Sequence, residues 1–561
     1  MRRSIVSVLL AGAAPLTALL IAAPAPAQSS AQMGPPDDQP TSWDAQRDVQ
    51  DDTGEGRMAV SVDLPDETPA DVAQLATSGA PVTALPDALR LAYWTSPALL
   101  AQRAAVKSVD YRVPQARAEY GPKLNYQLSD TYVRDSFEPT PNIFGQIPKG
   151  STIRSGWSTT AAAILTQPLF TFGRTFAQER FAVAQRAFQA QVLRSTEQQA
   201  MLDAVSAYVG LLRDRAGVTI ARDNLNSLEN ELGDNQSRFK VHEVTVTDIQ
   251  QVITRTELGR AQLYAAQRDA ASSEAVFVQK IGAPAGTLAA PNPLELPVRT
   301  LEEAYAYAEG HNPVLLAAHE RERVSRASLV SAKADLMPRV DFRGTYNYGS
   351  QSPYNNQARV KEQRGEFIIS GPIFESGLRQ ARVGEAKASN DADWRLIDGA
   401  LRDSRAQLAA AWNDWKSQDA SIGALGLSVE AAQKAYEGAL LQERAGLVTT
   451  LDVLQLAREL QAARSNYNSA IAGSYIGQAR VLAAMGALEQ RWLLPDDPQY
   501  NAQTHYDRVK RHGDVPLFTP LMRALDGLSV GPADKRALRD PAVKLETPPV
   551  KLDTVPVPAK K

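Results

Sequence analysis

Few residues have side chains suited to catalysis or metal binding, and most of them lack the necessary spacing. The chain has no cysteine, which excludes disulfides, thiolate metal sites, cysteine nucleophiles and a lipid-anchored N-terminus. Its five histidines, at positions 242, 311, 319, 505 and 512, show no metal-ligand spacing. Neither a glycine-rich phosphate loop nor a Gly-x-Ser-x-Gly element is present. The sequence therefore gives no basis for an enzyme, and no cofactor or metal is expected.

A Thr-x-x-Asp spacing occurs twice and is the clearest polar pattern. Thr245 stands three residues before Asp248, and Thr449 stands three residues before Asp452. This spacing is typical of a helix N-terminus, where the threonine caps free N–H groups and the acid lies near the positive end of the helix dipole. We therefore predict that each motif starts a helix.

A tight turn is predicted just before each motif. A turn that reverses two antiparallel helices commonly needs a residue with positive φ, usually glycine. Gly446 meets this need, whereas the corresponding position before the first motif is His242. Histidine adopts positive φ more readily than branched residues do. We interpret His242 as an exposed turn residue in preference to a pH sensor.

Charge and the N-terminal pattern narrow the class of protein. The net charge is -3, from 60 basic and 63 acidic residues, and no Lys/Arg stripe appears, so nucleic-acid binding is not expected. Arg2 and Arg3 precede an apolar run over 5–23, and Ala25-Pro26-Ala27 offers a cleavage site. This arrangement predicts a signal peptide over 1–27 in preference to a membrane anchor. Without another run of spanning length, the mature chain is expected to be periplasmic or to cross a membrane as a closed barrel.

The elements that must position the two motifs lie in long regions without proline. None of the 35 prolines falls between Pro168 and Pro284 or between Pro372 and Pro495. Both regions are rich in Ala, Leu, Gln, Glu and Arg, which favour helix, and they lack its strongest breaker. Long helices are predicted in both.

The two halves of the chain repeat each other. Pro122 corresponds to Pro338 at an offset of 216, and Pro168 corresponds to Pro372 at an offset of 204, so a 12-residue difference in length lies between these points. Self-similarity of this kind predicts two copies of one structural unit. Each copy is expected to contain a helix, a strand hairpin, a long helix, a tip and a second helix. Further pairs that share these offsets are Ser96-Pro97 with Asn312-Pro313, Gly173 with Gly377, Asp248 with Asp452 and Gly282 with Gly486.

Short segments after Pro122 and Pro338 have a period of two. Leu124, Tyr126 and Leu128 alternate with polar residues, and the same alternation continues over 339–348. This pattern predicts strands with one apolar and one polar face. Return strands are expected over 155–167 and 364–371. The aromatic residues suit a lipid-facing surface, although a small periplasmic β-domain with one buried face would give the same alternation.

The helices carry a coiled-coil pattern. Spacings of three and four residues alternate in two corresponding sets, and such a pattern predicts helices packed along their length in a supercoil. The region from Gly173 to Phe239 would form a helix of roughly 100 Å at the usual rise per residue. The two sets are Ile249, Val252, Thr256, Gly259, Leu263, Ala266 and Val453, Leu456, Leu460, Ala463, Tyr467, Ala470.

Four strands in one chain cannot close a barrel, and lipid does not tolerate an open sheet edge. Two chains would supply eight strands, which enclose only their own side chains, whereas three chains would supply twelve and leave an opening. The sequence supports a barrel shared by several chains and does not count them.

With both repeats in view, residues 80 to 495 resemble the TolC family of outer-membrane efflux and secretion proteins. The resemblance lies in the Asn312-Pro313 and Ser96-Pro97 pairs, in the strand-to-helix elements over 167–174 and 371–377, and in the tip elements over 238–248 and 444–452. Each piece is weak alone, and the ordered repetition makes the set specific.

This resemblance implies a mainly α-helical fold with a β-barrel part. Long antiparallel coiled-coil helices would form a tunnel, and four strands per chain would contribute to a twelve-stranded barrel in the outer membrane. It also implies a homotrimer that extends into the periplasm of a Gram-negative bacterium and contacts outer-membrane lipid. A periplasmic adaptor (membrane fusion) protein and an inner-membrane ABC or RND-type transporter are the implied partners. The function would be type I protein secretion or small-molecule efflux, with no enzyme activity.

The resemblance also suggests roles for the residues at the tips. Family members narrow their periplasmic entrance with carboxylates, which suggests Asp452 and Asp248 at a pore constriction as an alternative to helix capping. Gln455 stands where some members carry a second acid, so a weaker charged constriction is expected. Glu443, Arg444 and Val448 lie close by, and the sequence assigns them no role. The residues expected to dock the adaptor are Val241, His242, Val244, Thr245, Gly446, Leu447 and Thr449.

These arguments divide the chain into five parts. The competing class is a periplasmic structural coiled-coil protein without a pore. Both ends of the mature chain are rich in proline and lack periodicity, which predicts disorder. The expected parts are a signal peptide over 1–27, an acidic disordered segment over 28–80, a first repeat over 81–299 with its hairpin at 123–167 and tip at 239–248, a second repeat over 300–494 with its hairpin at 339–371 and tip at 443–452, and a disordered tail over 495–561.

Overall fold

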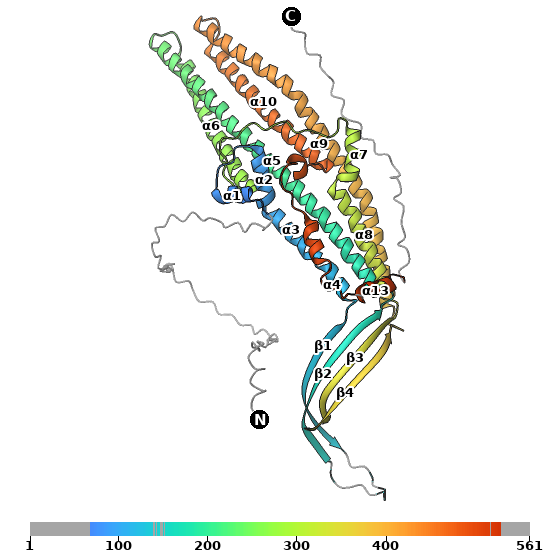
Figure 1. Cartoon of the computed structure of the whole chain (residues 1–561). Coiled ribbons are helices and arrows are strands. Elements are labelled where there is room, and N and C mark those ends of the chain that lie inside the picture. The colour runs from blue at the N-terminus through green and yellow to red at the C-terminus, as the bar shows by residue number, and fades with distance from the viewer. Residues whose placement is uncertain are drawn as a thin grey trace, which may run out of the picture. The chain divides into compact units, whose positions relative to one another are not determined.

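The computed structural model describes residues 68–137, 141, 143–145, 150, 152–516 and 518–528 (Figure 1). The chain divides into two units, Met1–Val60 and Ser61–Lys561, and the described residues all belong to the second. The predicted signal peptide over 1–27 and most of the predicted acidic segment over 28–80 lie outside the described residues. Within the described part of the chain, none of the helices combines the length and the apolar character needed to cross a membrane.

Two long helical hairpins form the main body. The first consists of α5 (Arg174–Lys240) and α6 (Val246–Ile281), and the second of α9 (Leu378–Arg444) and α10 (Thr450–Met485). Helices α5 and α9 have 67 residues each, which corresponds to roughly 100 Å. All four bounds of the second hairpin are those of the first plus 204, so the structure confirms the repeat helix by helix.

Shorter helices precede each strand hairpin. In the first repeat these are α2 (Leu85–Thr95), α3 (Pro97–Asp110) and α4 (Arg112–Ala118), and in the second they are α7 (Leu301–His311) and α8 (Pro313–Ala334). The bounds again correspond, now with the offset of 216. The first repeat differs in one respect, because α3 and α4 together match the single helix α8. Pro114 explains the break, since its ring clashes with the carbonyl four residues earlier, that of Asp110, where α3 ends.

The four strands form one antiparallel sheet in the order β1-β2-β3-β4. Its strands are β1 (Lys123–Phe137), β2 (Thr152–Phe170), β3 (Arg339–Ser352) and β4 (Asn355–Ser370). The return strands are therefore longer than predicted, most of all β4, which begins nine residues before the expected start at 364. The 12-residue difference between the repeats falls in the connections, which are residues 138–151 in the first hairpin and 353–354 in the second.

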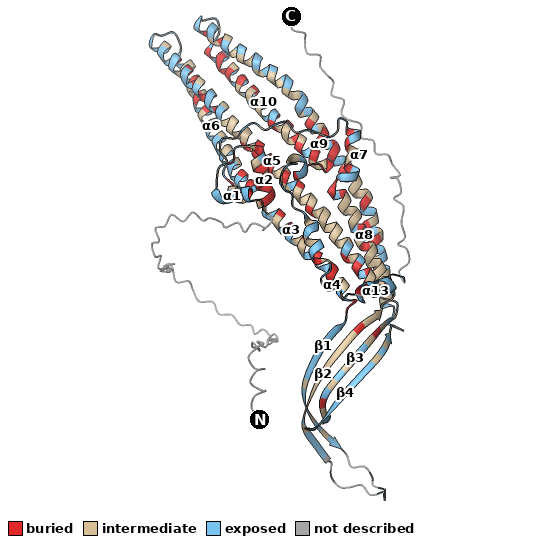
Figure 2. Ribbon diagram, in the orientation of Figure 1, coloured by how far each residue is buried: buried red, intermediate tan, exposed pale blue. Residues whose placement is uncertain are grey.

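The pairing of the strands confirms the predicted two-faced sheet. Tyr126 lies opposite Ala163, which in turn lies opposite Tyr346, so these side chains share one face. Tyr126 is 90% exposed, and Leu124 and Leu128 on the same face are also exposed. The opposite face carries polar residues such as Gln127, Ser129 and Thr160, which line a shallow hollow. Figure 2 shows that much of the sheet is exposed in one chain, and the exposed residues Leu124, Tyr126 and Leu128 make this face apolar.

The main hydrophobic core lies where α2 packs against the middle of α5 and the ends of α6 and α10. Its largest fully buried side chains include Trp94, Tyr208 and Phe277. A second cluster with Trp412 and Trp415 joins α7, α9 and α10. Burial of apolar surface in these two clusters stabilises the middle of α5 and α9 and the ends of α6 and α10. Towards the tips, each hairpin is stabilised mainly by the residues along its coiled-coil interface.

The predicted coiled-coil seams are buried or half-buried at every position. Val252, Thr256 and Gly259 are buried in α6, and Val453, Leu460 and Ala463 are buried in α10. Gly259 shows why the seam needs small residues, because a Cβ there would lie 2.9 Å from the Leu228 Cδ1 atom of α5.

The prediction of disorder over 495–561 is wrong for its first part. Two helices, α12 (Ala502–Val509) and α13 (Phe518–Gly527), follow the short α11 (Gln490–Leu493). His505 lies 2.8 Å from the buried carboxylate of Asp110, which Arg186 also contacts at 2.9 Å. These polar contacts fix α12 to α3 and α5. Their partners lie far earlier in the chain, so the sequence around residues 495–528 gives no indication of them.

The N-terminal boundary needs a smaller correction. Helix α1 (Ala70–Ser78) lies in the last part of the segment over 28–80 that was predicted to be disordered. Val72 anchors it, because this side chain is buried in the main hydrophobic core.

Candidate functional site: the tips of the two helical hairpins

The turns at the two tips have the same backbone geometry. His242 has φ of +66° and Gly446 has φ of +73°, as the sequence predicted for this position. Glu243 N–H donates to the Arg238 carbonyl at 3.0 Å, and Leu447 N–H donates to the Gln442 carbonyl at 2.9 Å. The His242 N–H also donates to the Phe239 carbonyl, and the Gly446 N–H donates to the Glu443 carbonyl, both at 2.9 Å. Together these are the hydrogen bonds of a Schellman motif. The histidine therefore adopts a left-handed conformation that costs a residue with a Cβ about 1–2 kcal/mol.

Both Thr-x-x-Asp motifs are capping boxes. Thr449 caps α10 by accepting the Asp452 N–H at 3.3 Å, and the Asp452 carboxylate accepts the Thr449 N–H at 3.0 Å and its hydroxyl at 2.7 Å. Thr245 and Asp248 make the same three bonds at the start of α6. The bonds from Thr449 lower the pKa of Asp452, so its carboxylate is ionised at neutral pH.

The capping bonds leave the residues proposed for a constriction accessible. Asp452 and Gln455 are exposed on the surface of α10, and Asp248 is half-buried on α6. Each aspartate binds within its own turn. Among the described residues, no group of three His, Asp or Glu side chains is arranged to hold a metal ion.

Several apolar side chains are exposed at the tips. Val241 is 64% exposed and Leu447 is 75% exposed, and Val244 is half-buried. Of the other residues predicted at the tips, His242, Thr245, Gly446 and Thr449 are exposed. Sequence reasoning missed further exposed apolar side chains in the same places, and only their apolar type next to a turn could have indicated them. These are Phe239, Val246, Leu441 and Leu451.

A buried polar cluster joins the two hairpins just behind the tips. Arg238 on α5 donates from Nη1 to Glu443 Oε1 on α9 at 2.9 Å, and the Thr450 hydroxyl of α10 donates to the same oxygen at 2.9 Å. Asn235 and Glu231 of α5 complete the cluster. Sequence reasoning placed Glu443 near the tip without a role and missed the other four residues, because their partners come from the other repeat.

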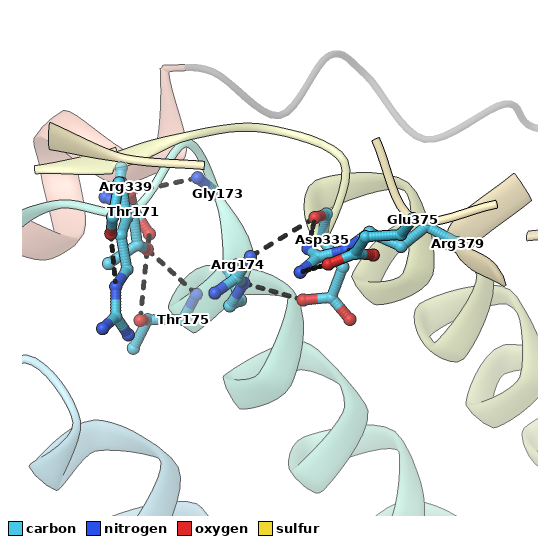
Figure 3. A network of polar contacts seen from close by, with 10 residues as sticks. Thr171, Gly173, Arg174, Thr175, Asp335, Arg339, Glu375 and Arg379 are labelled. Carbon is cyan, nitrogen blue, oxygen red and sulfur yellow. Dashed lines mark hydrogen bonds and ion pairs between the residues drawn. The ribbon is translucent and has the colours of Figure 1, made fainter. Parts of the chain in front are cut away.

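The opposite ends of the long helices follow the sheet through two equivalent elbows, which are residues 171–173 between β2 and α5 and residues 371–377 between β4 and α9. Arg174 at the start of α5 lies 2.7 Å from the Asp335 carboxylate, and Arg379 at the start of α9 donates to the Asp335 carbonyl (Figure 3). Arg379 also pairs with Glu375 at 2.5 Å. The two elbows are thus tied to the same residue. Residues with positive φ at the elbows are Phe172, Gly173, Ser376 and Gly377.

Helix α13 adds a further bond at the first elbow. The buried Asp526 carboxylate accepts the Thr171 N–H at 2.8 Å and the Gly173 N–H at 3.0 Å. These N–H groups precede α5, so the carboxylate stabilises the positive end of the helix.

At the far end of the sheet, the β3–β4 turn folds over the polar face of the β1–β2 hairpin. The Tyr354 hydroxyl donates to Asp135 at 2.7 Å, and the Thr159 N–H donates to Asn356 Oδ1 at 2.8 Å. The turn comes so close to β2 that a Cβ on Gly156 would lie 1.6 Å from the Tyr354 carbonyl oxygen. Glycine is therefore required at position 156 for this arrangement.

Comparisons with known proteins agree on one group of relatives. The profile of the family described as outer membrane efflux protein matches residues 88–283 and 304–487. The outer membrane efflux protein BepC of Brucella suis is 24% identical over 433 residues, which cover 76% of this chain and 90% of BepC. The alkaline protease secretion protein AprF of Pseudomonas aeruginosa is 26% identical over 339 residues, which cover 58% of this chain and 69% of AprF. The structure of the Campylobacter jejuni CmeC outer membrane channel has a similar fold, with a TM-score of 0.65, 14% identity, and coverage of 77% of this chain and 90% of CmeC.

Proposed function

Because the chain belongs to the outer membrane efflux protein family, we propose that three copies form a channel that carries substrates from the periplasm to the exterior. The proposal depends most on one observation, the sheet with an exposed apolar face and two free edges. Strand β1 pairs only with β2, and β4 pairs only with β3, within the described residues. Lipid does not tolerate free edges, so neighbouring copies must supply the missing partners.

Three sheets would close into a barrel of twelve strands. The exposed face with Leu124, Tyr126 and Leu128 would contact lipid, and the face with Gln127, Ser129 and Thr160 would line a water-filled interior. Two copies would give a barrel filled by its own side chains, which would leave no passage.

The long helices would continue the barrel as a periplasmic tunnel. Helices of roughly 100 Å, tied at both elbows to Asp335 at the end of α8, extend far beyond any bilayer. The small seam residues let these helices pack closely in a cylinder wall.

A channel of this kind holds no energy source of its own, so we infer that it works with an inner-membrane transporter of the ABC or RND type through a periplasmic adaptor protein. Each tip exposes apolar side chains, Val241 at the first and Leu447 at the second, which supports the tips as the adaptor contact because exposed apolar residues next to polar ones are typical of a protein interface. His242, Val244, Thr245, Gly446 and Thr449 belong to the same proposed surface.

Asp452, Gln455 and Asp248 are proposed to narrow the periplasmic entrance. Three copies of an exposed, ionised carboxylate around an axis would attract cations and slow anions. The capping bonds do not compete with this role, since they orient the carboxylate without neutralising it.

Planar-bilayer recordings test the proposal. The purified full-length protein should produce stable single-channel currents, and Asp452→Asn should reduce their cation preference. Release of the protein from cells by osmotic shock, together with the absence of current, would refute the channel and favour a structural periplasmic protein.

The transported substrate is tested separately. The names of the relatives include both efflux and protease secretion. Deleting the gene and measuring secreted proteins alongside drug accumulation will distinguish the two uses, and a change in drug accumulation alone would exclude secretion.

A further inference from the structure

Two glutamates lie close together between the hairpins, because Asn235 binds Glu231 at 2.7 Å and Thr450 joins Asn235 to Glu443. Glu231 on α5 is 6% exposed, and Glu443 on α9 is 4% exposed. Both lie within the last three turns of their helices, just behind the tips. A pair of buried carboxyl groups is costly when both are ionised, so its persistence in the fold needs a compensating interaction.

Hydrogen bonds identify Glu443 as the ionised member. Its Oε1 atom accepts from the Arg238 guanidinium at 2.9 Å and from the Thr450 hydroxyl at 2.9 Å. Both bonds are stronger when the acceptor carries a negative charge. The negative charge of the pair therefore resides on Glu443.

Glu231 is the member that holds a proton. Its Oε1 atom accepts from Asn235 Nδ2 at 2.7 Å, and no cation pairs with it among the described residues. Burial, followed by the charge of Glu443, raises the pKa of Glu231 to about 7, and a hydrogen bond between the two side chains adds to this shift. A protonated Glu231 can donate its O–H to the Glu443 carboxylate.

Other ionisable groups around the pair come from the same two helices. Asp234 on α5 also raises the pKa of Glu231, and it lies 3.9 Å from Arg444 on α9. Burial, and to a smaller extent the charge of Glu231, raises the pKa of the Tyr436 phenol of α9. Arg238 lies 3.5 Å from the exposed Glu243 besides its bond to Glu443. Helix α10 contributes the neutral Thr450.

We propose that a proton shared by Glu231 and Glu443 is a latch, which holds the tips of the two hairpins together and opens when the proton is lost. Loss of the proton places two negative charges close together in a buried seam, and Arg238 can balance only one of them. The repulsion is relieved when α5 and α9 separate and both carboxylates reach water.

The direction of the pH effect follows from the pKa of Glu231. In separated hairpins this carboxyl would titrate near its ordinary value of 4.5, whereas in the docked hairpins it titrates at about 7. Docking is therefore strongest below pH 4.5, weakens as the pH rises towards 7, and is weakest above 7. The consequence for transport rests on the proposed channel: the periplasmic entrance would close in acid and open towards alkaline pH.

The test compares the full-length wild-type protein with Glu231→Gln in two measurements. Infrared spectroscopy follows the carbonyl band of a protonated carboxyl between pH 4 and 9, and planar-bilayer recordings follow conductance over the same range. The amide of Glu231→Gln donates to Glu443 at every pH and cannot be deprotonated, so it mimics the closed latch. Glu437→Gln, an exposed position six residues before Glu443 on α9, is the matched control.

The latch predicts three results. Wild type and Glu437→Gln should show a protonated-carboxyl band that disappears with a midpoint near 7, and Glu231→Gln should lack it. Conductance should rise through the same pH range in wild type and control, and it should stay low in Glu231→Gln. A spectrum without this band, a band unchanged in Glu231→Gln, or the same pH response in all three proteins would overturn the latch. If no protein conducts at any pH, the proposed channel fails, and the infrared band still decides whether the proton is shared.

Discussion

Replacing Thr449 by alanine should loosen the first turn of α10 by a predictable amount. The substitution removes the hydroxyl that accepts the Asp452 N–H at 3.3 Å and donates to its carboxylate at 2.7 Å. Loss of a threonine cap typically costs about 1 kcal/mol. Because about 1.4 kcal/mol corresponds to a tenfold change in an equilibrium constant, the equilibrium constant for local opening of this turn should rise about 5-fold.

Hydrogen exchange measured by mass spectrometry gives the necessary local readout. Peptides that contain residues 450–454 should exchange about 5-fold faster in Thr449→Ala. Thr449→Ser keeps the hydroxyl and should behave as wild type. Thr245→Ala is the matched variant in the first repeat, and it should show the same acceleration at the start of α6. Unchanged exchange in both alanine variants would refute the capping geometry.

The aspartate of the same motif separates capping from its proposed role in the pore. Asp452→Asn keeps an oxygen that can accept the Thr449 N–H but loses the charge. It should therefore reduce cation preference and accelerate exchange at 450–454 only slightly, because the interaction with the helix dipole is lost while the capping bond remains. Asp452→Ala loses the bond as well and should exchange clearly faster. Unchanged cation preference in Asp452→Asn would contradict a separate electrostatic role.

Three further predictions concern positions at which glycine and a residue with a Cβ should behave differently. Gly446→Val forces a branched side chain to positive φ and should weaken transport that depends on the adaptor while membrane insertion is unaffected; normal transport would exclude the turn from the docking surface. His242→Gly removes the cost of a Cβ at φ +66° and should stabilise the first tip by about 1 kcal/mol, seen as slower hydrogen exchange over 238–246. Gly156→Ala places a Cβ where a backbone carbonyl now lies and should displace the β3–β4 turn, so the Thr159 amide should exchange faster. Gly344→Ala is the control, because a Cβ there has its nearest neighbours at 3.8 Å. Equal exchange in the two variants would argue against the folded turn.

The repeated architecture could be predicted from sequence because its determinants are local. Proline and glycine fix where helices and strands end, and the same residues recur at constant offsets. The two capping boxes and the positive φ of His242 and Gly446 were predictable for the same reason, since each depends on a few consecutive residues.

Contacts between distant segments could not be predicted in this way. Arg238 and Glu443 belong to different repeats and do not occupy equivalent positions, so the internal alignment gives no indication that they pair. The same limit explains the helices between residues 502 and 527. His505 binds Asp110, and Asp526 accepts the Gly173 N–H at the first elbow, so both residues are positioned by partners hundreds of residues earlier in the chain.

In the proposed channel, neighbouring copies complete the sheet of each chain. Native mass spectrometry of the protein extracted in mild detergent counts the chains in one particle. We expect a single species with three copies. A uniform species with one copy would leave the edges of β1 and β4 without partners and would refute the shared barrel.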